Sequence, residues 1–179
     1  QEASKLYNKG EKAMARSKDR TARKAFKRIT KEHPLSSVAP QAYMRLGELY
    51  EQHDEPIDAF DFYSELASKY PNSDLYSEAL RRQEKIAFAA VEGELKNSFL
   101  GLKSRIPSKR CATMLEAVAS NAPQSERAAK ARFRIGQLFE QREESTKAKL
   151  AYLKVIDEHP YSKHASEAQF RIGELLMTE

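Results

Sequence analysis

Apolar residues recur along the chain at helical spacing, between prolines that stand at a fixed interval. Pro34 and Pro71 lie 37 residues apart, as do Pro123 and Pro160, and a serine follows two residues after each of the four. Proline cannot continue a helix, whereas serine is a good cap for the next one. Each P-x-S sequence therefore predicts the end of one helix and the start of another.

Upstream of each proline, three kinds of residue trace one face of a helix. Their spacings of four and three residues are those of helical neighbours. The small residues are Ala22, Ala59, Cys111 and Ala148, the large ones Phe26, Tyr63, Leu115 and Tyr152, and the aliphatic ones Ile29, Leu66, Val118 and Val155. The recurrence predicts that the same kind of helix is built four times.

The first helix of most repeats carries a glycine where two helices should cross closely. The second repeat has Tyr43, Leu46, Gly47, Tyr50, Ala59, Tyr63 and Pro71, and the fourth has Ile135, Gly136, Phe139, Ala148, Tyr152 and Pro160. This order resembles the tetratricopeptide repeat, in which W-x2-L-G-x2-Y precedes a small residue, an aromatic residue and proline. The resemblance predicts an all-α, right-handed superhelical solenoid of about nine helices: four full pairs and a final unpaired helix.

The repeats form a single array over 1–179, with approximate limits of 2–34, 36–71, 73–123, 125–160 and a partial fifth unit at 162–179. The third unit carries an insertion, EGELKNSFLGLKSRI, at 92–106. Because no proline occurs between Ser73 and Ile106, we expect one long helix there, bent near Gly93 or Gly101. The array stops after the first helix of a fifth unit, which favours a fragment of a longer protein.

Basic residues are concentrated at the N-terminus. The net charge is +5, but residues 1–33 hold 11 Lys and Arg against 4 Asp and Glu, which leaves −2 for the remainder. Such a segment can face an anionic membrane, a nucleic acid or an acidic protein, or can be a solvated helix face. No nucleic acid is expected, because no basic platform interleaved with aromatic residues is present. No apolar run is long enough to span a membrane.

The chain lacks the residue patterns of catalytic and metal sites. It has no glycine-rich phosphate loop and no H-E-x-x-H sequence. His33 and His159 occupy the same repeat position, directly before proline, which indicates an architectural role. Cys111, the single cysteine, takes the place of an alanine at a helix crossing and should be buried. We therefore predict a non-enzymatic protein with no catalytic residue, metal site or cofactor.

Recurring residues on the first helices, which build the concave wall of such an array, predict a binding groove instead. One stripe holds Tyr7, Met44, Arg81, Phe133 and Phe170, with Lys85 and Phe88 farther along, and beside it runs an arginine ladder of Arg45, Arg82, Arg134 and Arg171. Aromatic and methionine side chains edged by arginines suit an extended peptide or a partner's apolar helix. The same residues could equally pack against neighbouring helices or pair with acidic groups there.

The insertion is a second candidate binding element. Leu95, Phe99, Leu102 and Ile106 recur in it at near-helical spacing, among basic residues. The helix that follows is not lengthened to match, so an extended helix would have to cover another surface. That surface could belong to a partner or to this domain itself.

The segment YPNSDLYSEALRR, residues 70–82, followed by the expected long helix, resembles BamD-like lipoproteins of the bacterial β-barrel assembly machine. The resemblance implies a place on the periplasmic face of the bacterial outer membrane, with a lipid anchor that is absent from this chain. It implies two partners: the barrel-forming assembly subunit, and unfolded outer-membrane proteins whose terminal signal ends in an aromatic residue. Alternatives are another periplasmic repeat adaptor that coordinates envelope processes, and a cytoplasmic peptide-binding co-chaperone.

Overall fold

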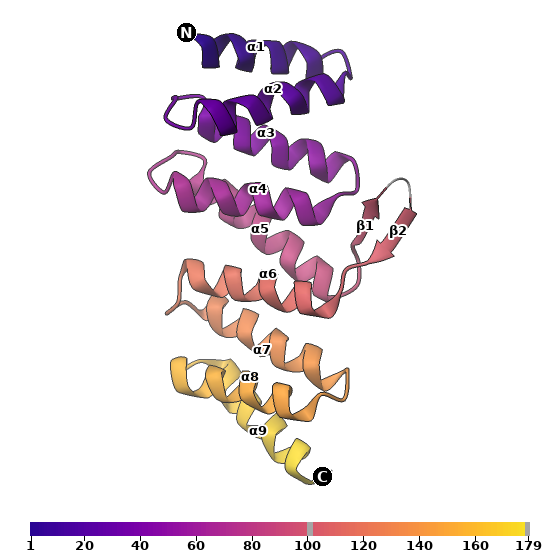
Figure 1. Cartoon of the computed structure of the whole chain (residues 1–179). Helices are drawn as coiled ribbons and strands as arrows, with labels where there is room; N and C mark the ends of the chain where they lie inside the picture. Colours follow the sequence, from indigo (N-terminus) through magenta and orange to yellow (C-terminus); the bar gives the residue numbers. More distant parts are fainter. Residues whose placement is uncertain (100–101, 178–179) are drawn as a thin grey trace. The chain divides into compact units, whose positions relative to one another are not determined.

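Nine α-helices in tandem and one β-hairpin make up the part of the chain that the structure, a computed structural model, describes: residues 1–99 and 102–177 (Figure 1). The elements are α1 (Glu2–Met14), α2 (Asp19–Glu32), α3 (Ala39–Gln52), α4 (Pro56–Lys69), α5 (Tyr76–Val91), β1 (Lys96–Phe99), β2 (Leu102–Arg105), α6 (Ser108–Asn121), α7 (Glu126–Glu140), α8 (Ser145–Glu158) and α9 (Lys163–Met177). The predicted array of about nine helices is confirmed, and the hairpin is the departure from it.

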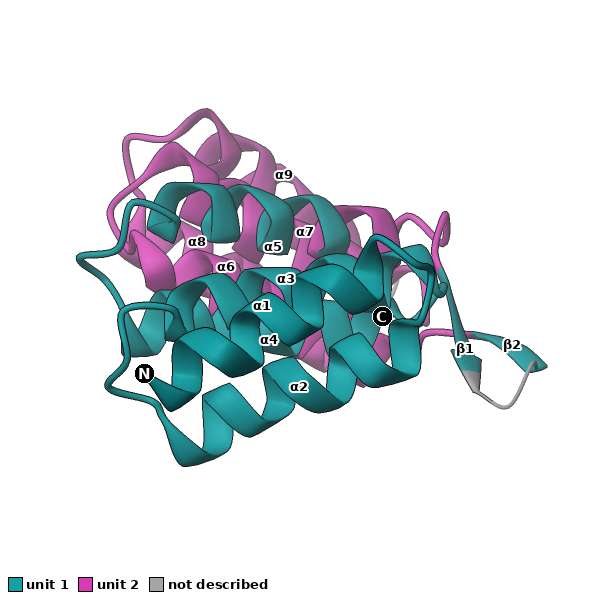
Figure 2. Cartoon of the chain, turned by 90° about the horizontal axis from the view of Figure 1, so that it is seen from above, with its two compact units in different colours: residues 1–86, 96–104 teal, residues 87–95, 105–179 magenta. Residues whose placement is uncertain are grey.

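The chain divides into two compact units, coloured teal and magenta in Figure 2. Unit 1 comprises Gln1–Ile86 and Lys96–Ser104, and unit 2 comprises Ala87–Leu95 and Arg105–Glu179. In unit 1, α1 packs on α2, α2 on α3 and α3 on α4, whereas in unit 2, α6 packs on α7, α7 on α8 and α8 on α9. From α1 to α4 and from α6 to α9, helices that follow one another in sequence are therefore neighbours in space.

A glycine sets the close approach of two helices in each unit. In unit 1, a Cβ atom on Gly47 would lie 2.3 Å from a ring carbon of Tyr63, and in unit 2, one on Gly136 would lie 2.3 Å from a ring carbon of Tyr152. Both tyrosine rings are fully buried. The helices can approach this closely only because glycine has no side chain, as the repeat pattern predicted.

The turn inside a helix pair uses a left-handed residue at a fixed repeat position. Ser17, Asp54 and Glu143 have φ angles of 53°, 57° and 59°, and each stands the same distance before the proline of its repeat. After the first of these, Lys18 N–H donates to the Ala13 carbonyl at 2.9 Å. This bond satisfies a carbonyl at the end of the helix and turns the chain back.

The expectation of a long third-unit helix is wrong beyond Val91, where α5 ends. Gly93 adopts a φ of +77°, a left-handed conformation that glycine enters without steric cost. Glu94 N–H donates to the Ala89 carbonyl at 3.0 Å, which closes a helix C-cap. Strands β1 and β2 follow in place of a helix. Gly101, the other predicted bend, lies outside the described residues.

The hairpin is fastened to the α3–α4 turn of unit 1 (Figure 1). Ser98 N–H donates to the Asp54 carbonyl at 2.8 Å, and Lys103 Nζ lies 2.6 Å from the carboxylate of the same aspartate. The Asn97 side chain also accepts from Ile57 N–H at 3.4 Å. One side of the insertion therefore covers a surface of this domain, the local alternative that the sequence left open.

Apolar side chains fill the space between the packed helices. In unit 1, Phe26, Leu46 and Leu66 have no exposed surface, and in unit 2 the same holds for Leu115 and Val155. All of these residues except Leu46 belong to the recurring face upstream of the prolines, so that face is the core face. None of the helices in the described part is both long and apolar enough to cross a membrane.

Candidate functional site

The predicted stripe does not form an apolar surface in unit 1. Met44 belongs to the core, with 6% of its surface exposed, which is the packing role that the sequence left open beside ligand binding. Tyr7 is half-buried, and its ring centroid lies 5.6 Å from that of Phe26. Arg81 and Lys85 are exposed, and the arginine forms an ion pair within its own helix.

In unit 2 the stripe contains both buried and exposed rings. Phe133 is 3% exposed and stacks on His164 at a centroid distance of 5.3 Å, which is the packing role that the sequence left open beside ligand binding. Phe88 is half-buried, with Lys130 Nζ 4.7 Å from its ring centroid. Phe170 on α9 is 63% exposed. A ligand can therefore reach the Phe170 ring, whereas Phe133 serves the packing of α7.

The arginine ladder of unit 1 is paired with carboxylates. Arg45 donates from two nitrogens to the two carboxylate oxygens of Glu11, at 2.9 and 3.1 Å, and from a third to Glu48 at 2.9 Å. Hydrogen bonding to Glu48, followed by that to Glu11, raises the pKa of Arg45. Arg82 likewise donates to Glu51 at 2.9 Å. Each arginine thus bonds a glutamate on the preceding first helix.

The same arrangement recurs in unit 2. Arg134 donates to Glu92, just after α5, at 2.7 Å, and to Gln137 at 2.8 Å. Arg171 pairs with Glu140 on α7. All four ladder positions therefore meet an acidic group on, or directly after, the preceding first helix. This is the structural alternative that the sequence left open for the arginines.

Within the ladder, Arg171 on α9 has the longest ion pairs. Its Nη1 lies 3.2 Å from Glu174 and 3.6 Å from Glu140, whereas each of the other three arginines has a carboxylate oxygen within 3.0 Å. The Arg171 Nε is buried and has no hydrogen-bond acceptor among the described residues. Phe170 beside it is exposed, and nothing described lies within 4 Å of a Cβ placed on Gly173, one turn farther on.

Two tyrosines connect the ladder to the helix crossings. Tyr63 donates its hydroxyl to Glu51 at 2.5 Å, and Tyr152 donates to Glu140 at 2.6 Å. Burial raises the pKa of both tyrosines, and the hydrogen bond to a glutamate raises it further. The ring of each tyrosine also packs on the glycine of its helix pair. The glutamates thereby hold an arginine and a core tyrosine at once.

The predicted docking residues of the insertion are in different environments. Ile106 is buried and Leu95 is half-buried, whereas Leu102 is 77% exposed. The side chain of Phe99 lies outside the described residues. Of the three described side chains, Leu102 is the one that presents a large apolar surface to a partner. The docking role of the insertion stays a prediction.

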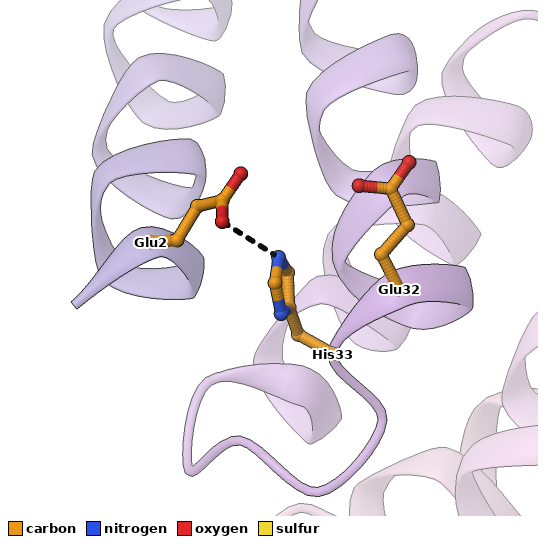
Figure 3. Close-up of side chains that lie close together, drawn as sticks. All are labelled: Glu2, Glu32 and His33. Carbon is orange, nitrogen blue, oxygen red and sulfur yellow. Dashed lines mark ion pairs between the residues drawn. The ribbon is translucent and has the colours of Figure 1, made fainter.

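One group of side chains that the sequence did not indicate lies where the start of α1 meets the end of α2 (Figure 3). Glu2, Glu32 and His33 bring ligand-type atoms within 4.8 Å of one another, and the imidazole points toward Glu2 at 3.9 Å. Arg28 already bonds to both carboxylates, at 3.3 and 2.8 Å. Its hydrogen bond lowers the pKa of Glu32. The group is therefore an ion-pair network around a guanidinium.

A buried arginine takes the place of the first motif aromatic in the fourth repeat. Arg132 is 6% exposed, and its Nη1 lies 2.6 Å from Glu158 and 2.8 Å from Nε2 of His159. Burial, helped by the neighbouring guanidinium, lowers the pKa of His159. Cys111 is buried in α6, and burial raises the pKa of its thiol. These groups belong to the packed interior of unit 2.

Two family models of the tetratricopeptide repeat match the chain, over residues 7–74 and 130–162. Together they cover more than half of its length. The first match spans nearly all of α1 to α4, and the second spans most of α7 and all of α8. A search of curated proteins finds no match to the chain.

Solved structures with a similar backbone share little sequence with the chain. MamA 41-end from Desulfovibrio magneticus RS-1 is 17% identical, with a TM-score of 0.42, over 99% of this chain and 97% of that one. PilF from Pseudomonas aeruginosa is 14% identical, with a TM-score of 0.44, over 94% and 66% of the two chains. A tetratricopeptide repeat protein from Parabacteroides merdae is 13% identical, with a TM-score of 0.43, over 99% and 61%. Likeness at this level assigns no function.

Proposed function

Because the chain belongs to the tetratricopeptide-repeat family, whose stacked helix pairs bind other proteins, we propose that it holds the carboxyl terminus of a partner protein on α9. The incompletely bonded guanidinium of Arg171 beside the exposed ring of Phe170 carries this proposal. A ligand carboxylate can accept charge-assisted hydrogen bonds from such a guanidinium. An aromatic ligand side chain can pack on the exposed ring of Phe170.

A peptide that ends in an aromatic residue meets both requirements. Unfolded outer-membrane proteins, to which the resemblance with BamD-like lipoproteins points, carry a terminal signal of this form. We therefore propose further that the protein is a BamD-like component of outer-membrane β-barrel assembly on the periplasmic face. In this role it also binds the barrel-forming assembly subunit. The sequence at 70–82 supports the assignment, and the end of α5 at Val91 is where the chain departs from the family's long helix.

Peptide titration on two α9 variants tests the site. Truncation of an aromatic anchor typically costs about 2 kcal/mol, and loss of a charged hydrogen bond about 1.5–3 kcal/mol. Phe170→Ala and Arg171→Ala should therefore each weaken a fluorescent peptide with a C-terminal phenylalanine at least tenfold, as measured by anisotropy. Because both side chains are at least partly exposed, the melting temperature should change little.

Arg45→Ala is the matched control, since this arginine occupies the same ladder position on α3 but has three short bonds to glutamates. It should leave peptide affinity unchanged. Equal affinity of the unaltered protein and both α9 variants would refute the site. An equal loss in all three variants would show that the ladder as a whole, rather than α9, binds the peptide.

A further inference from the structure

The outward face of α1 is basic where the corresponding face of α3 is apolar. In repeat register, Lys5, Lys9 and Lys12 of α1 correspond to Ala42, Leu46 and Leu49 of α3. The three α3 residues have no exposed surface, and α3 packs against α2 and α4. The lysines of α1 are exposed instead. Lysines thus occupy the positions at which helices of this fold bury apolar side chains to stack.

These lysines line a groove between α1 and the start of α2. The groove encloses about 590 Å³, and its five cationic side chains are Lys5, Lys9, Lys12, Arg16 and Lys18. Asn8, Ala13 and Thr21 complete the lining, so the wall described contains no carboxylate. A groove of this composition concentrates positive potential and attracts anions.

The five cations have no ion pairs within 4 Å among residues 1–99 and 102–177. The two acidic residues of α1 are engaged elsewhere, because Glu11 pairs with Arg45 and Glu2 pairs with Arg28. Asp19, at the start of α2, pairs with His53. A face that only had to be solvated would be more stable with both signs of charge interspersed, since like charges repel. The single sign of the charge therefore points to an anionic partner.

We propose that this basic groove binds an acidic α-helix of a partner protein. Lys5, Lys9 and Lys12 follow one another on α1 at spacings of four and three residues, over about 11 Å of helix length at about 1.5 Å per residue, and Arg16 follows four residues later in the turn after α1. A second helix with Asp or Glu at the same spacing presents carboxylates at matching intervals. In this fold, the corresponding face of α3 is covered by neighbouring helices. The acidic helix occupies the equivalent place on α1, held by charge rather than by apolar contacts.

Two other anionic partners fit the groove less well. Sequence-tolerant nucleic-acid binding uses aromatic side chains on which bases stack, and the described lining contains none. Binding in a membrane surface uses exposed large apolar residues. Within the described chain, the large apolar residues that are exposed lie outside both α1 and α2. A protein helix needs neither feature.

The test is titration of a labelled alanine-based helical peptide, with glutamates spaced four, three and four residues apart, into the full chain at low salt. The double variant Lys9→Glu with Lys12→Glu is expected to weaken binding at least tenfold, and added salt should weaken it in the unaltered protein. Lys24→Glu with Lys31→Glu is the matched control, because both lysines are exposed on α2 and lie outside the groove. This control changes the net charge equally and should alter affinity less than twofold.

Failure of the acidic peptide to bind, or an equal loss in the two double variants, overturns the proposal. The same titration with duplex DNA and with phosphatidylserine vesicles separates the classes of partner. The proposal is also overturned if DNA or the vesicles bind more tightly than the peptide and the Lys9 and Lys12 variant loses that binding. Since the groove lies in unit 1 and the α9 site in unit 2, binding of the aromatic-ended peptide should be unaffected by these variants. Failure of one proposal is therefore distinguishable from failure of the other.

Discussion

Replacement of Gly136 with alanine should destabilise the protein, although alanine favours the helix more than glycine does. The new Cβ would lie 2.3 Å from Cε1, 2.5 Å from Cδ1 and 2.8 Å from Cζ of Tyr152. Because non-bonded carbon atoms pack at about 3.5–4.0 Å, the ring must move by roughly 1 Å. Tyr152 is fully buried and its hydroxyl donates to Glu140, so the ring has little freedom to move.

The size of the effect follows from two opposing contributions. Overpacking of a core typically costs about 1–3 kcal/mol, and the helix propensity of alanine returns about 1 kcal/mol. We therefore expect Gly136→Ala to lower the free energy of unfolding by up to about 2 kcal/mol. Gly47→Ala should act alike in unit 1, and leucine at either position should cost several kcal/mol, since more atoms must be accommodated.

Gly173→Ala is the matched control, because this glycine is also helical, in the same unit, but has nothing described within 4 Å of its Cβ position. Only the propensity contribution acts there, so stability should rise by up to about 1 kcal/mol. In thermal melts followed by circular dichroism, about 2–4 °C per kcal/mol is expected for a chain of this size. Melting temperatures that shift in the same direction for Gly136→Ala and Gly173→Ala would refute the crossing argument.

Three further changes should be measurable in the same melts. Gly93→Ala forces a left-handed φ on alanine and should cost about 1–2 kcal/mol, and a neutral result would contradict the C-cap. Tyr152→Phe removes the hydroxyl that donates to Glu140 and should cost about 1 kcal/mol, and an unchanged melting temperature would contradict this role. Burial holds the pKa of His159 below its ordinary value of about 6.5, so the unfolded chain binds more protons near that pH. Stability should therefore fall as the pH drops from 8 to 5, and a fall that is equally steep in His159→Gln would contradict the assignment.

The helix pairs could be predicted because their signals are local and repeated. The glycine and the aromatic residue sixteen positions later recur as Gly47 with Tyr63 and as Gly136 with Tyr152, and the structure brings both pairs into contact. The end of α5 could not be predicted in the same way. Its cause is the left-handed backbone at Gly93, and a glycine in a helical pattern does not by itself reveal that conformation.

Less of the candidate site than of the fold could be predicted from the sequence. The recurrence of the arginines was visible, but their partners come from the preceding repeat, as with Glu51 and Arg82. The burial of Met44 and Phe133 likewise depends on how neighbouring helices cover them. The excess of basic residues was plain in the sequence. Only the fold shows that five of them line one groove, whose described lining holds no carboxylate.

The affinity difference between two versions of one aromatic-ended peptide tests the proposed protein-binding role most directly. One version has a free terminal carboxylate and the other a terminal amide, and both are titrated by calorimetry into the unaltered protein and into Arg171→Ala. The carboxylate should bind at least tenfold more tightly to the unaltered protein, because a charged hydrogen bond contributes about 1.5–3 kcal/mol. Arg171→Ala should abolish that difference. Equal affinity of the two peptides for the unaltered protein would contradict carboxylate binding on α9.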